Sequence, residues 1–353
     1  MNMELLPRSA LKISTLALAM AFASFGTTAV MASECQLNDA NATTILGSTS
    51  NVKTALACGN AAVAGGTNDT VAIGNQAKAG MNSATAVGGQ ANAAGLGSTS
   101  IGWQSKATGE RAQAFGHLAD ASGVRATAVG EAAMAGGTND TVAIGNQAKA
   151  GMNSATAVGG QANAAGLGST SIGWQSEATG ERAQAFGHLA KATGVRATAV
   201  GEAAMAGGTN DTVAVGNKAN AGLNSATAVG GEANAAGLGS SSIGWQSAAT
   251  GERAQAFGHL AKATGVRATA VGEAATAKGE SSIAIGNIAV AGGLNSIAIG
   301  NGATAANRDQ VVLGKAGQVK SSTAAQTGTV SIVTIDENGT LGTMLVDYYK
   351  SAQ

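Results

Sequence analysis

Three histidines recur at one position of a long repeat and are the first candidates for metal or acid–base chemistry. His117, His188 and His259 follow one another at equal intervals, once in each copy of the repeat. If each interval corresponds to five stacked β-coils, neighbouring histidines lie about 24 Å apart and cannot bind one metal ion within a chain. We therefore expect surface histidines, with three equivalent copies meeting at the axis of a trimer as the alternative. We predict no metal and no cofactor.

Two glycine-containing segments have part of the composition of ligand-binding loops. Gly65-Gly66-Thr67-Asn68-Asp69 lacks the nine-residue period of calcium-binding β-rolls, so we expect an enlarged turn there. Gly95-Leu96-Gly97 is not followed by the Lys-Ser or Lys-Thr pair of a phosphate-binding loop. The sequence contains no catalytic constellation, so we predict neither an enzyme nor a small-molecule substrate.

The three tryptophans follow glycines that end strands, where turns are expected to begin. Aromatic and arginine side chains are frequent anchors of protein interfaces, and an arginine recurs with each tryptophan. The pattern leaves two interpretations. One is contact between chains or packing within a turn, and the other is a periodic ligand-binding stripe. The residues concerned are Trp103, Trp174 and Trp245, with Arg111, Arg182 and Arg253.

The composition restricts the scaffold that can position these residues. Of 353 residues, 53 are glycine and one is proline, charged residues make up 11%, aromatic residues make up 3%, and the formal net charge is zero. Without abundant proline or clusters of basic residues, the chain is neither collagen-like nor a nucleic-acid-binding protein. The hydrophobic fraction of 44%, mostly alanine, is too high for typical disorder and requires a fold that buries small side chains regularly.

Residues 1–32 have the organisation of a secretory signal peptide. Arg8 and Lys12 accompany an apolar stretch from Ile13 to Phe25, and Val30-Met31-Ala32 offers a small-x-small cleavage site. We therefore predict that the chain is exported.

Both cysteines lie just after this segment, and export permits a disulfide between Cys35 and Cys58. Closing a loop of this length would stabilise the fold by roughly 3 kcal/mol in the chain-entropy model. Two unpaired, small apolar residues are the alternative.

Internal repeats determine the expected fold. Residues 64–134, 135–205 and 206–276 are three copies of one long unit. Within each copy, a large apolar residue followed by glycine recurs with a fourteen-residue period, and a single longer step leads into the next copy. The whole series contains 19 such repeats from Cys58 to Leu313. In the first copy the large residues are Ile73, Val87, Ile101, Phe115 and Val129.

Alternation with period two makes each short repeat a pair of strands separated by two glycine-containing turns. We expect a flattened β-coil in which Thr85 and Val87 face Ala91 and Ala93 across a thin interior. The small residue between the branched ones would then form a flat outer face suited to another chain. We also expect the glutamines that interrupt the threonine ladder to point inward. The small residues are Ala72, Ala86, Ser100, Ala114 and Ala128, and the glutamines are Gln113 and Gln184.

Stacked coils form a solenoid with parallel ladders, which the absence of proline after Pro7 permits. Substitutions between the copies provide a test of the stacking. Lys106 and Asp120 are separated by one period, and the second copy has Glu177 and Lys191 at these positions, so both signs reverse together. We predict that each pair lies side by side on adjacent coils.

Asn295-Ser296-Ile297-Ala298-Ile299-Gly300 and the repeats in phase with it resemble the head repeats of trimeric autotransporter adhesins, the YadA-like family. The resemblance covers about residues 55–315 and implies an all-β, left-handed parallel β-roll that forms a homotrimer. It divides the chain into an N-terminal cap at 33–57, head repeats at 58–315 and a short C-terminal β segment at 316–353. The last segment has no room for the family's stalk and membrane anchor, so we expect no self-anchoring.

The resemblance also implies the head of a bacterial adhesin, at the cell surface or outer membrane or secreted. Such heads attach to extracellular-matrix proteins such as collagen, with many weak copies acting together. The family's Asn-Ser motif would contact the ligand. An ice-binding solenoid and a structural spacer without a receptor are the alternatives. The matching candidate ligand-binding residues are Asn82, Ser83, Asn153, Ser154, Asn224, Ser225, Asn295 and Ser296, beside the three tryptophans.

Overall fold

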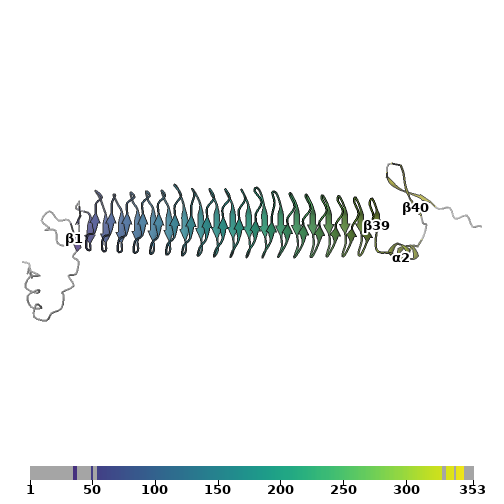
Figure 1. The fold of residues 1–353 in the computed structure, drawn as a ribbon, viewed down its shortest axis with the longest axis horizontal. Coiled ribbons are helices and arrows are strands. Elements are labelled where there is room, and N and C mark those ends of the chain that lie inside the picture. The colour runs from purple at the N-terminus through teal and green to yellow at the C-terminus, as the bar shows by residue number, and fades with distance from the viewer. Residues whose placement is uncertain (1–34, 38–48, 51–53, 328–330, 338, 346–353) are drawn as a thin grey trace, which may run out of the picture.

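The computed structural model describes residues 35–37, 49–50, 54–327, 331–337 and 339–345. Its main body is a long rod of stacked coils, each made of one three-residue strand, a turn, one two-residue strand and a second turn (Figure 1). The predicted all-β parallel solenoid of fourteen-residue coils is confirmed. The predicted signal peptide lies outside the described residues.

The three-residue strands form sheet A, in which every strand except β1 runs parallel to its neighbours. Sheet A contains β1 (Cys35–Leu37), β3 (Leu56–Cys58), β5 (Val71–Ile73), β7 (Thr85–Val87), β9 (Thr99–Ile101), β11 (Gln113–Phe115), β13 (Thr127–Val129), β15 (Val142–Ile144), β17 (Thr156–Val158), β19 (Thr170–Ile172), β21 (Gln184–Phe186), β23 (Thr198–Val200), β25 (Val213–Val215), β27 (Thr227–Val229), β29 (Ser241–Ile243), β31 (Gln255–Phe257), β33 (Thr269–Val271), β35 (Ile283–Ile285), β37 (Ile297–Ile299) and β39 (Val311–Leu313).

The two-residue strands form sheet B on the other side of the coil. Sheet B contains β2 (Thr49–Ser50), β4 (Val63–Ala64), β6 (Lys78–Ala79), β8 (Asn92–Ala93), β10 (Lys106–Ala107), β12 (Asp120–Ala121), β14 (Met134–Ala135), β16 (Lys149–Ala150), β18 (Asn163–Ala164), β20 (Glu177–Ala178), β22 (Lys191–Ala192), β24 (Met205–Ala206), β26 (Asn220–Ala221), β28 (Asn234–Ala235), β30 (Ala248–Ala249), β32 (Lys262–Ala263), β34 (Thr276–Ala277), β36 (Val290–Ala291) and β38 (Thr304–Ala305).

The ladder register places equivalent residues of successive coils directly beside one another. Lys106 pairs with Asp120, and Glu177 pairs with Lys191, whose Nζ lies 3.8 Å from Glu177 Oε2. The prediction that these charges lie on adjacent coils is therefore confirmed, and the sign reversal between copies is explained by the stacking.

The expected orientation of the three-residue strands is wrong. The middle residue of each strand points inward, so that Ala86 is completely buried, whereas Thr85 and Val87 on either side are partly exposed. Across the interior, Ala93 of β8 and Ala91, which precedes this strand, are also completely buried. The same holds for the other small residues expected on the outer face, which are Ala72, Ser100, Ala114 and Ala128.

The inversion has a steric cause. Alternation divides a strand into two sets of side chains, and both sets are compatible with the same period. The two sheets lie so close together that the largest fully buried side chains of the described residues are threonines and serines. Branched and long side chains must therefore point outward, and this includes Gln113 and Gln184, which are exposed rather than inward-facing.

The turn after each three-residue strand requires glycine for two reasons. Gly88 has a φ of 130°, and a Cβ there would lie 2.5 Å from the carbonyl oxygen of Gly102 in the next coil. Each coil therefore stacks on the next through a glycine column. Proline would remove a ladder donor that the parallel strands need on both sides.

Additional elements flank the rod. At its start, β1 pairs antiparallel with β3 and covers the edge of sheet A, where an uncovered strand would invite aggregation. After β39, the helix α2 (Gln318–Ala324) is followed by the hairpin β40 (Ser331–Ile335) and β41 (Leu341–Leu345). The alternation in the sequence indicates the hairpin, but the seven-residue helix was not expected. Among the described residues, no helix is long and apolar enough to span a membrane.

The β1–β3 register also bears on the cysteines. Cys35 stands opposite Cys58 in the antiparallel pair. Cys58 is disulfide-bonded, and Cys35 is the other cysteine of the chain. Both observations support the predicted disulfide.

Candidate binding faces and edges

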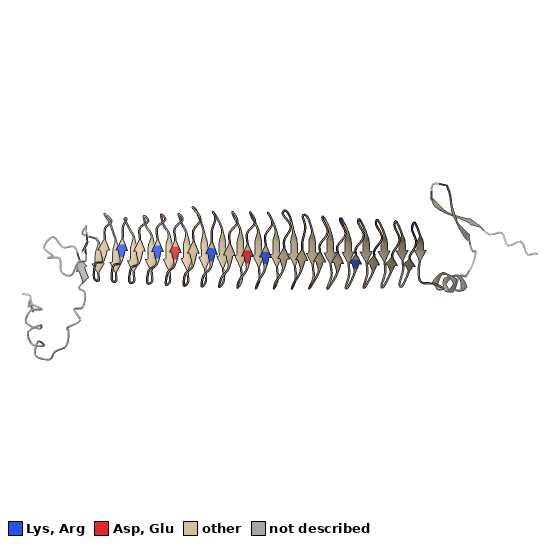
Figure 2. Ribbon diagram, viewed as in Figure 1, with Lys and Arg blue, Asp and Glu red and all other residues tan. Residues whose placement is uncertain are grey.

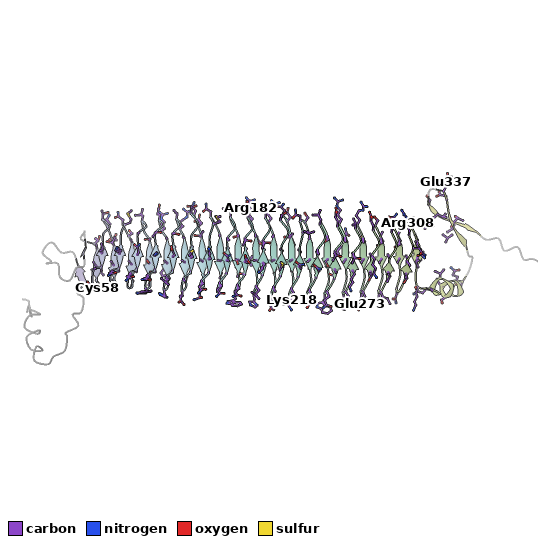
Figure 3. All side chains as sticks on the ribbon, in the orientation of Figure 1. Cys58, Arg182, Lys218, Glu273, Arg308 and Glu337 are labelled. Carbon is purple, nitrogen blue, oxygen red and sulfur yellow. The ribbon has the colours of Figure 1, made fainter. Side chains whose placement is uncertain are left out.

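The rod presents four long surfaces to solvent. Two are the outer faces of sheets A and B. The first edge consists of the turns that follow three-residue strands, such as 102–105, and the second edge consists of the turns that follow two-residue strands, such as 108–111. Figure 3 separates the two edges, with Lys218 and Glu273 on the first and Arg182 and Arg308 on the second.

The outer face of sheet A is uncharged and carries two columns, one mostly of threonine, valine and glutamine and one of apolar side chains. None of its described strands contains a charged residue. One branched or aromatic side chain per coil forms a continuous column, and members such as Ile101, 38% exposed, and Ile299, 41% exposed, are only partly covered. A contiguous apolar surface of this length on a soluble chain is typical of a protein interface.

The outer face of sheet B is polar. Its charged residues are few, and two pairs of opposite sign stand on adjacent coils, as Figure 2 shows. They are Lys78, Lys106, Asp120, Lys149, Glu177, Lys191 and Lys262. A groove of about 490 Å³ crosses this face in the first copy, lined by Gln76, Lys78, Gln90, Asn92, Gln104, Lys106, Leu118 and Asp120. Amide and ammonium groups there can donate hydrogen bonds to an extended polar ligand.

Three of the four predicted Asn-Ser pairs lie on the second edge and belong to a turn-stabilising arrangement. The Oδ1 atom of Asn82 accepts hydrogen bonds from the backbone nitrogen and the hydroxyl of Thr67, at 2.7 and 2.5 Å. This asparagine therefore stabilises the enlarged turn at 65–69, as predicted for that segment, while Ser83 is exposed beside it. The equivalent bonds join Asn153 to Thr138 and Asn224 to Thr209, with Ser154 and Ser225 following.

The fourth pair occupies a different register. Asn295, with a φ of 52°, stands at the turn position that Ser83 holds in the first copy. Ser296 consequently falls on the inner position of Ala84 and is completely buried, with no hydrogen-bond partner for its hydroxyl. Asn295 Nδ2 donates to Asp309 at 3.0 Å. The structure therefore does not place the four Asn-Ser pairs in equivalent environments.

The tryptophans stand in one column of the first edge together with the histidines. Trp103 is 50% exposed, and its indole packs against the imidazole of His117 with ring centroids 5.0 Å apart. His117 Nδ1 lies 3.5 Å from Glu131 Oε1, and Glu131 accepts a hydrogen bond from Asn146 at 3.0 Å. The same arrangement recurs at Trp174, His188 and Glu202, and at Trp245, His259 and Glu273.

The turn that carries each tryptophan is attached to the interior by a short polar chain. Ser100 and Ser105 face each other across the coil with their hydroxyl oxygens 2.7 Å apart, and Ser105 also donates to the carbonyl of Gly102 at 3.1 Å. On the preceding coil, Gly89 lies beside the indole, and a Cβ at this glycine would be 3.0 Å from Trp103 Cδ1. The indole is thus held between a glycine and a histidine.

The second edge is charged and uses its arginines in two ways. Arg125 forms a bidentate ion pair with Asp140 on the next coil, with Nη2 to Oδ2 at 2.7 Å. This hydrogen bond lowers the pKa of Asp140 below its usual range. Arg111, by contrast, has only a 3.9 Å contact with Glu110 of its own turn and a side chain 71% exposed. The copies repeat both arrangements at Arg196 and Arg182.

The histidines do not form a metal site within this chain. They recur along one edge, five coils apart, as the repeat spacing predicts. Among the residues that the structure describes, no group of three histidine, cysteine, aspartate or glutamate side chains could hold a metal ion.

Comparison with known proteins agrees with this architecture. A family model, the YadA head domain repeat, matches more than half of the chain. The chain belongs to the YadA head-repeat family. The matched segments are 79–105, 93–119, 121–148, 150–176, 178–204, 224–247, 235–261, 249–275, 263–289, 277–303 and 291–307.

Among solved structures, the crystal structure of the collagen-binding domain of the Yersinia adhesin YadA is similar to this YadA-type head. The two sequences are 20% identical, with a TM-score of 0.20, over 58% of this chain and 80% of that chain. No curated protein matches the sequence. The predicted resemblance is confirmed, and membership supports an adhesin-type function, since YadA-like adhesins are cell-surface autotransporters.

Proposed function

We propose that this YadA-type head is a homotrimer that attaches a bacterial surface to an extracellular-matrix protein of the collagen type. The observation that carries the proposal is the uncharged column of branched side chains along sheet A. In water this column is an unfavourable surface for a thin rod whose interior contains little more than alanine. Packing of three sheet A faces around one axis would bury it and leave the polar face of sheet B outward.

A pair of variants within one coil tests the trimer. Val129→Lys, on sheet A, would bring three lysines together near the axis, and we expect loss of the trimer because buried like charges repel. Met134→Lys, on the exposed face of sheet B, is the matched control and should leave the trimer intact. Trimers from both variants would count against sheet A as the interface.

Matrix attachment would use the outward face. The groove formed by Lys78, Asn92 and Lys106 beside the glutamine column is the proposed contact surface. The exposed Ser83 hydroxyl and its copies are further candidates, since Asn82 itself stabilises a turn. The lysine groove belongs to the first copy, because Glu177 and Ala248 stand at the Lys106 position in the other two. Each contact would be weak, and the three chains, together with the repeated serine, would supply avidity.

Solid-phase binding to collagen, fibronectin and laminin tests the ligand. We expect saturable binding of the trimer to collagen that falls when Lys78 and Lys106 are both replaced by glutamate. Binding to none of the three proteins would refute matrix attachment and favour a spacer.

One observation favours a second function. The threonines of sheet A point outward on a flat face, as in the Thr156-Ala157-Val158 strand, and this geometry suits an ice surface. The glutamines at Gln113 and Gln184 also point outward and interrupt the threonine column. Ice binding and trimerisation would need the same face, so thermal hysteresis by a monomer would replace the adhesin proposal.

A further inference from the structure

We infer that each tryptophan of the first edge contacts an arginine of the second edge of the neighbouring chain, Trp103 with Arg111, Trp174 with Arg182, and Trp245 with Arg253. The inference rests on the proposed trimer and adds the contacts that fix how its chains meet. It gives a role to three half-exposed indoles and to three guanidinium groups that extend from the rod with most of their surface in solvent.

Symmetry determines which edges meet. In a cyclic trimer every interface is heterologous, so one patch of a chain contacts a different patch of the next chain. With sheet A turned toward the axis, the first edge of one protomer therefore lies beside the second edge of its neighbour. A rotation about an axis parallel to the rod does not shift one chain along another. Residues that face each other across the interface must therefore lie at the same distance along the rod.

The tryptophans and arginines satisfy this condition. Trp103 and Arg111 belong to the same coil and are eight residues apart, which corresponds to roughly 3 Å along the rod at about 4.8 Å per coil. Arg111 leans back over Gly97 of the preceding coil, since its Cγ lies 3.8 Å from the position of a Cβ there. Trp103 leans back over Gly89 in the same direction. The two side chains therefore reach similar heights on opposite edges.

The period gives a second, independent argument. Tryptophan and this arginine both recur once in each copy of the long repeat, and in every copy a glycine precedes each of them by one coil. Arg125, one coil further, is already paired with Asp140 and is not available in the same way. The second edge thus presents one arginine per module whose ion pair is a loose 3.9 Å contact within its own turn, at the level where the first edge presents its one indole.

Arginine above an indole is a favourable pair. The ring quadrupole attracts a cation placed within about 6 Å of its centroid, and tryptophan is the best of the aromatic partners. His117 and Glu131 hold the indole in position, and the guanidinium can stack on its exposed surface. Nine such contacts, three per chain, would fix the axial register of the protomers along sheet A, where the apolar column alone would tolerate sliding.

A double-mutant cycle on the full chain tests the inference. The substitutions come from the chain's own repeats, so that the coil can accept them. Trp174→Asn is chosen because Asn146 occupies the equivalent position two coils earlier. Arg182→Ser is chosen because Ser154 occupies the equivalent turn position two coils earlier. The measured quantity is the dissociation constant of the trimer, obtained by sedimentation equilibrium.

We expect each single variant to raise this constant by about 2–5-fold for each of the three pairs at that level. The dissociation constant of the double variant should not exceed that of the single variant with the larger effect, because either substitution already removes the contact. Arg196→Ser is the matched control. It breaks an ion pair within one chain. The fold-changes in the dissociation constant caused by Arg196→Ser and Trp174→Asn should therefore multiply in the double variant.

If the protein is a trimer but the effects of Trp174→Asn and Arg182→Ser on its dissociation constant multiply, the contact is refuted and the proposed trimer is not. A wild-type chain that sediments as a monomer would overturn both. Quenching of tryptophan fluorescence by acrylamide gives a second readout, in which Arg182→Ser should expose an indole that the trimer protects. Unchanged quenching would also contradict the contact.

Discussion

Enlarging one inward alanine should destabilise the rod, whereas replacing its outward neighbour should leave the stability almost unchanged. Ala157 in β17 is completely buried, with Ala143 and Ser171 directly beside it on the adjacent coils. Thr156, the preceding residue, points outward beside Val142 and Thr170. Ala157→Val adds two methyl groups to an interior in which the largest fully buried side chain of the described residues is threonine, whereas Thr156→Val extends a column that already contains valine.

The expected cost of overpacking is about 1–3 kcal/mol for Ala157→Val. Because the entropy of unfolding grows with chain length, a chain of this size loses roughly 1–2 °C in melting temperature for each kcal/mol, so we expect a decrease of about 1–6 °C by circular dichroism. Thr156→Val should change the free energy of unfolding by less than about 0.5 kcal/mol. If Ala157→Val is tolerated and Thr156→Val destabilises, then the branched residues face inward and the assigned orientation is incorrect.

Three further predictions concern the ladders and the edges. Gly159→Ala should destabilise the rod, because its φ is 131° and the new Cβ would lie 2.5 Å from a backbone oxygen, while Gly151→Ala, whose Cβ would make an ordinary contact 3.9 Å from the Ala165 Cα, should not; thermal melting of both variants compares them. Deletion of residues 135–205 should leave a folded, shorter rod, because the junction restores the register of the remaining copies, and small-angle scattering should show shortening by about 24 Å rather than unfolding. Arg125 lowers the pKa of Asp140, so this carboxylate contributes stability above its unfolded pKa of about 3.8 that is lost as pH falls through the lower folded pKa; Asp140→Asn should flatten the stability profile below about pH 4, and an unchanged acid limb would contradict the pairing.

Much of the fold was predictable because the repeats record the stacking. Regular spacing from Ile73 to Leu313 requires equivalent coils, and the paired reversal of Lys106 with Asp120 identifies neighbours that no local propensity could reveal. The strand pair, the two turns and the enlarged turn near Thr67 all follow from period and glycine placement. The register then positions the tryptophan, histidine and arginine columns without further information.

The inward set of side chains was not predictable from alternation. Period two separates Ala86 from Thr85 and Val87, but the choice between them depends on the distance between the sheets, which the turns determine. Side-chain volume was the available signal, since alanine or serine occupies the middle of nearly every three-residue strand. The different register of Asn295 and Ser296 was equally hidden, because the loss of one turn residue shifts a motif by one place and exchanges inside for outside.

The helix α2 was not predicted from the sequence for a different reason. Residues 318–324 follow the last coil and carry no repeat, so only propensity over seven residues was available to predict them. Such a short segment is marginal on propensity alone.

The solution mass of the purified chain tests the central claim most directly. The full chain has a mass of 33.9 kDa, and sedimentation equilibrium should give three times the mass of one protomer, with no smaller species at working concentrations. A single-chain mass would contradict the trimer, leave the apolar column of sheet A unexplained, and remove the basis for the contacts between edges.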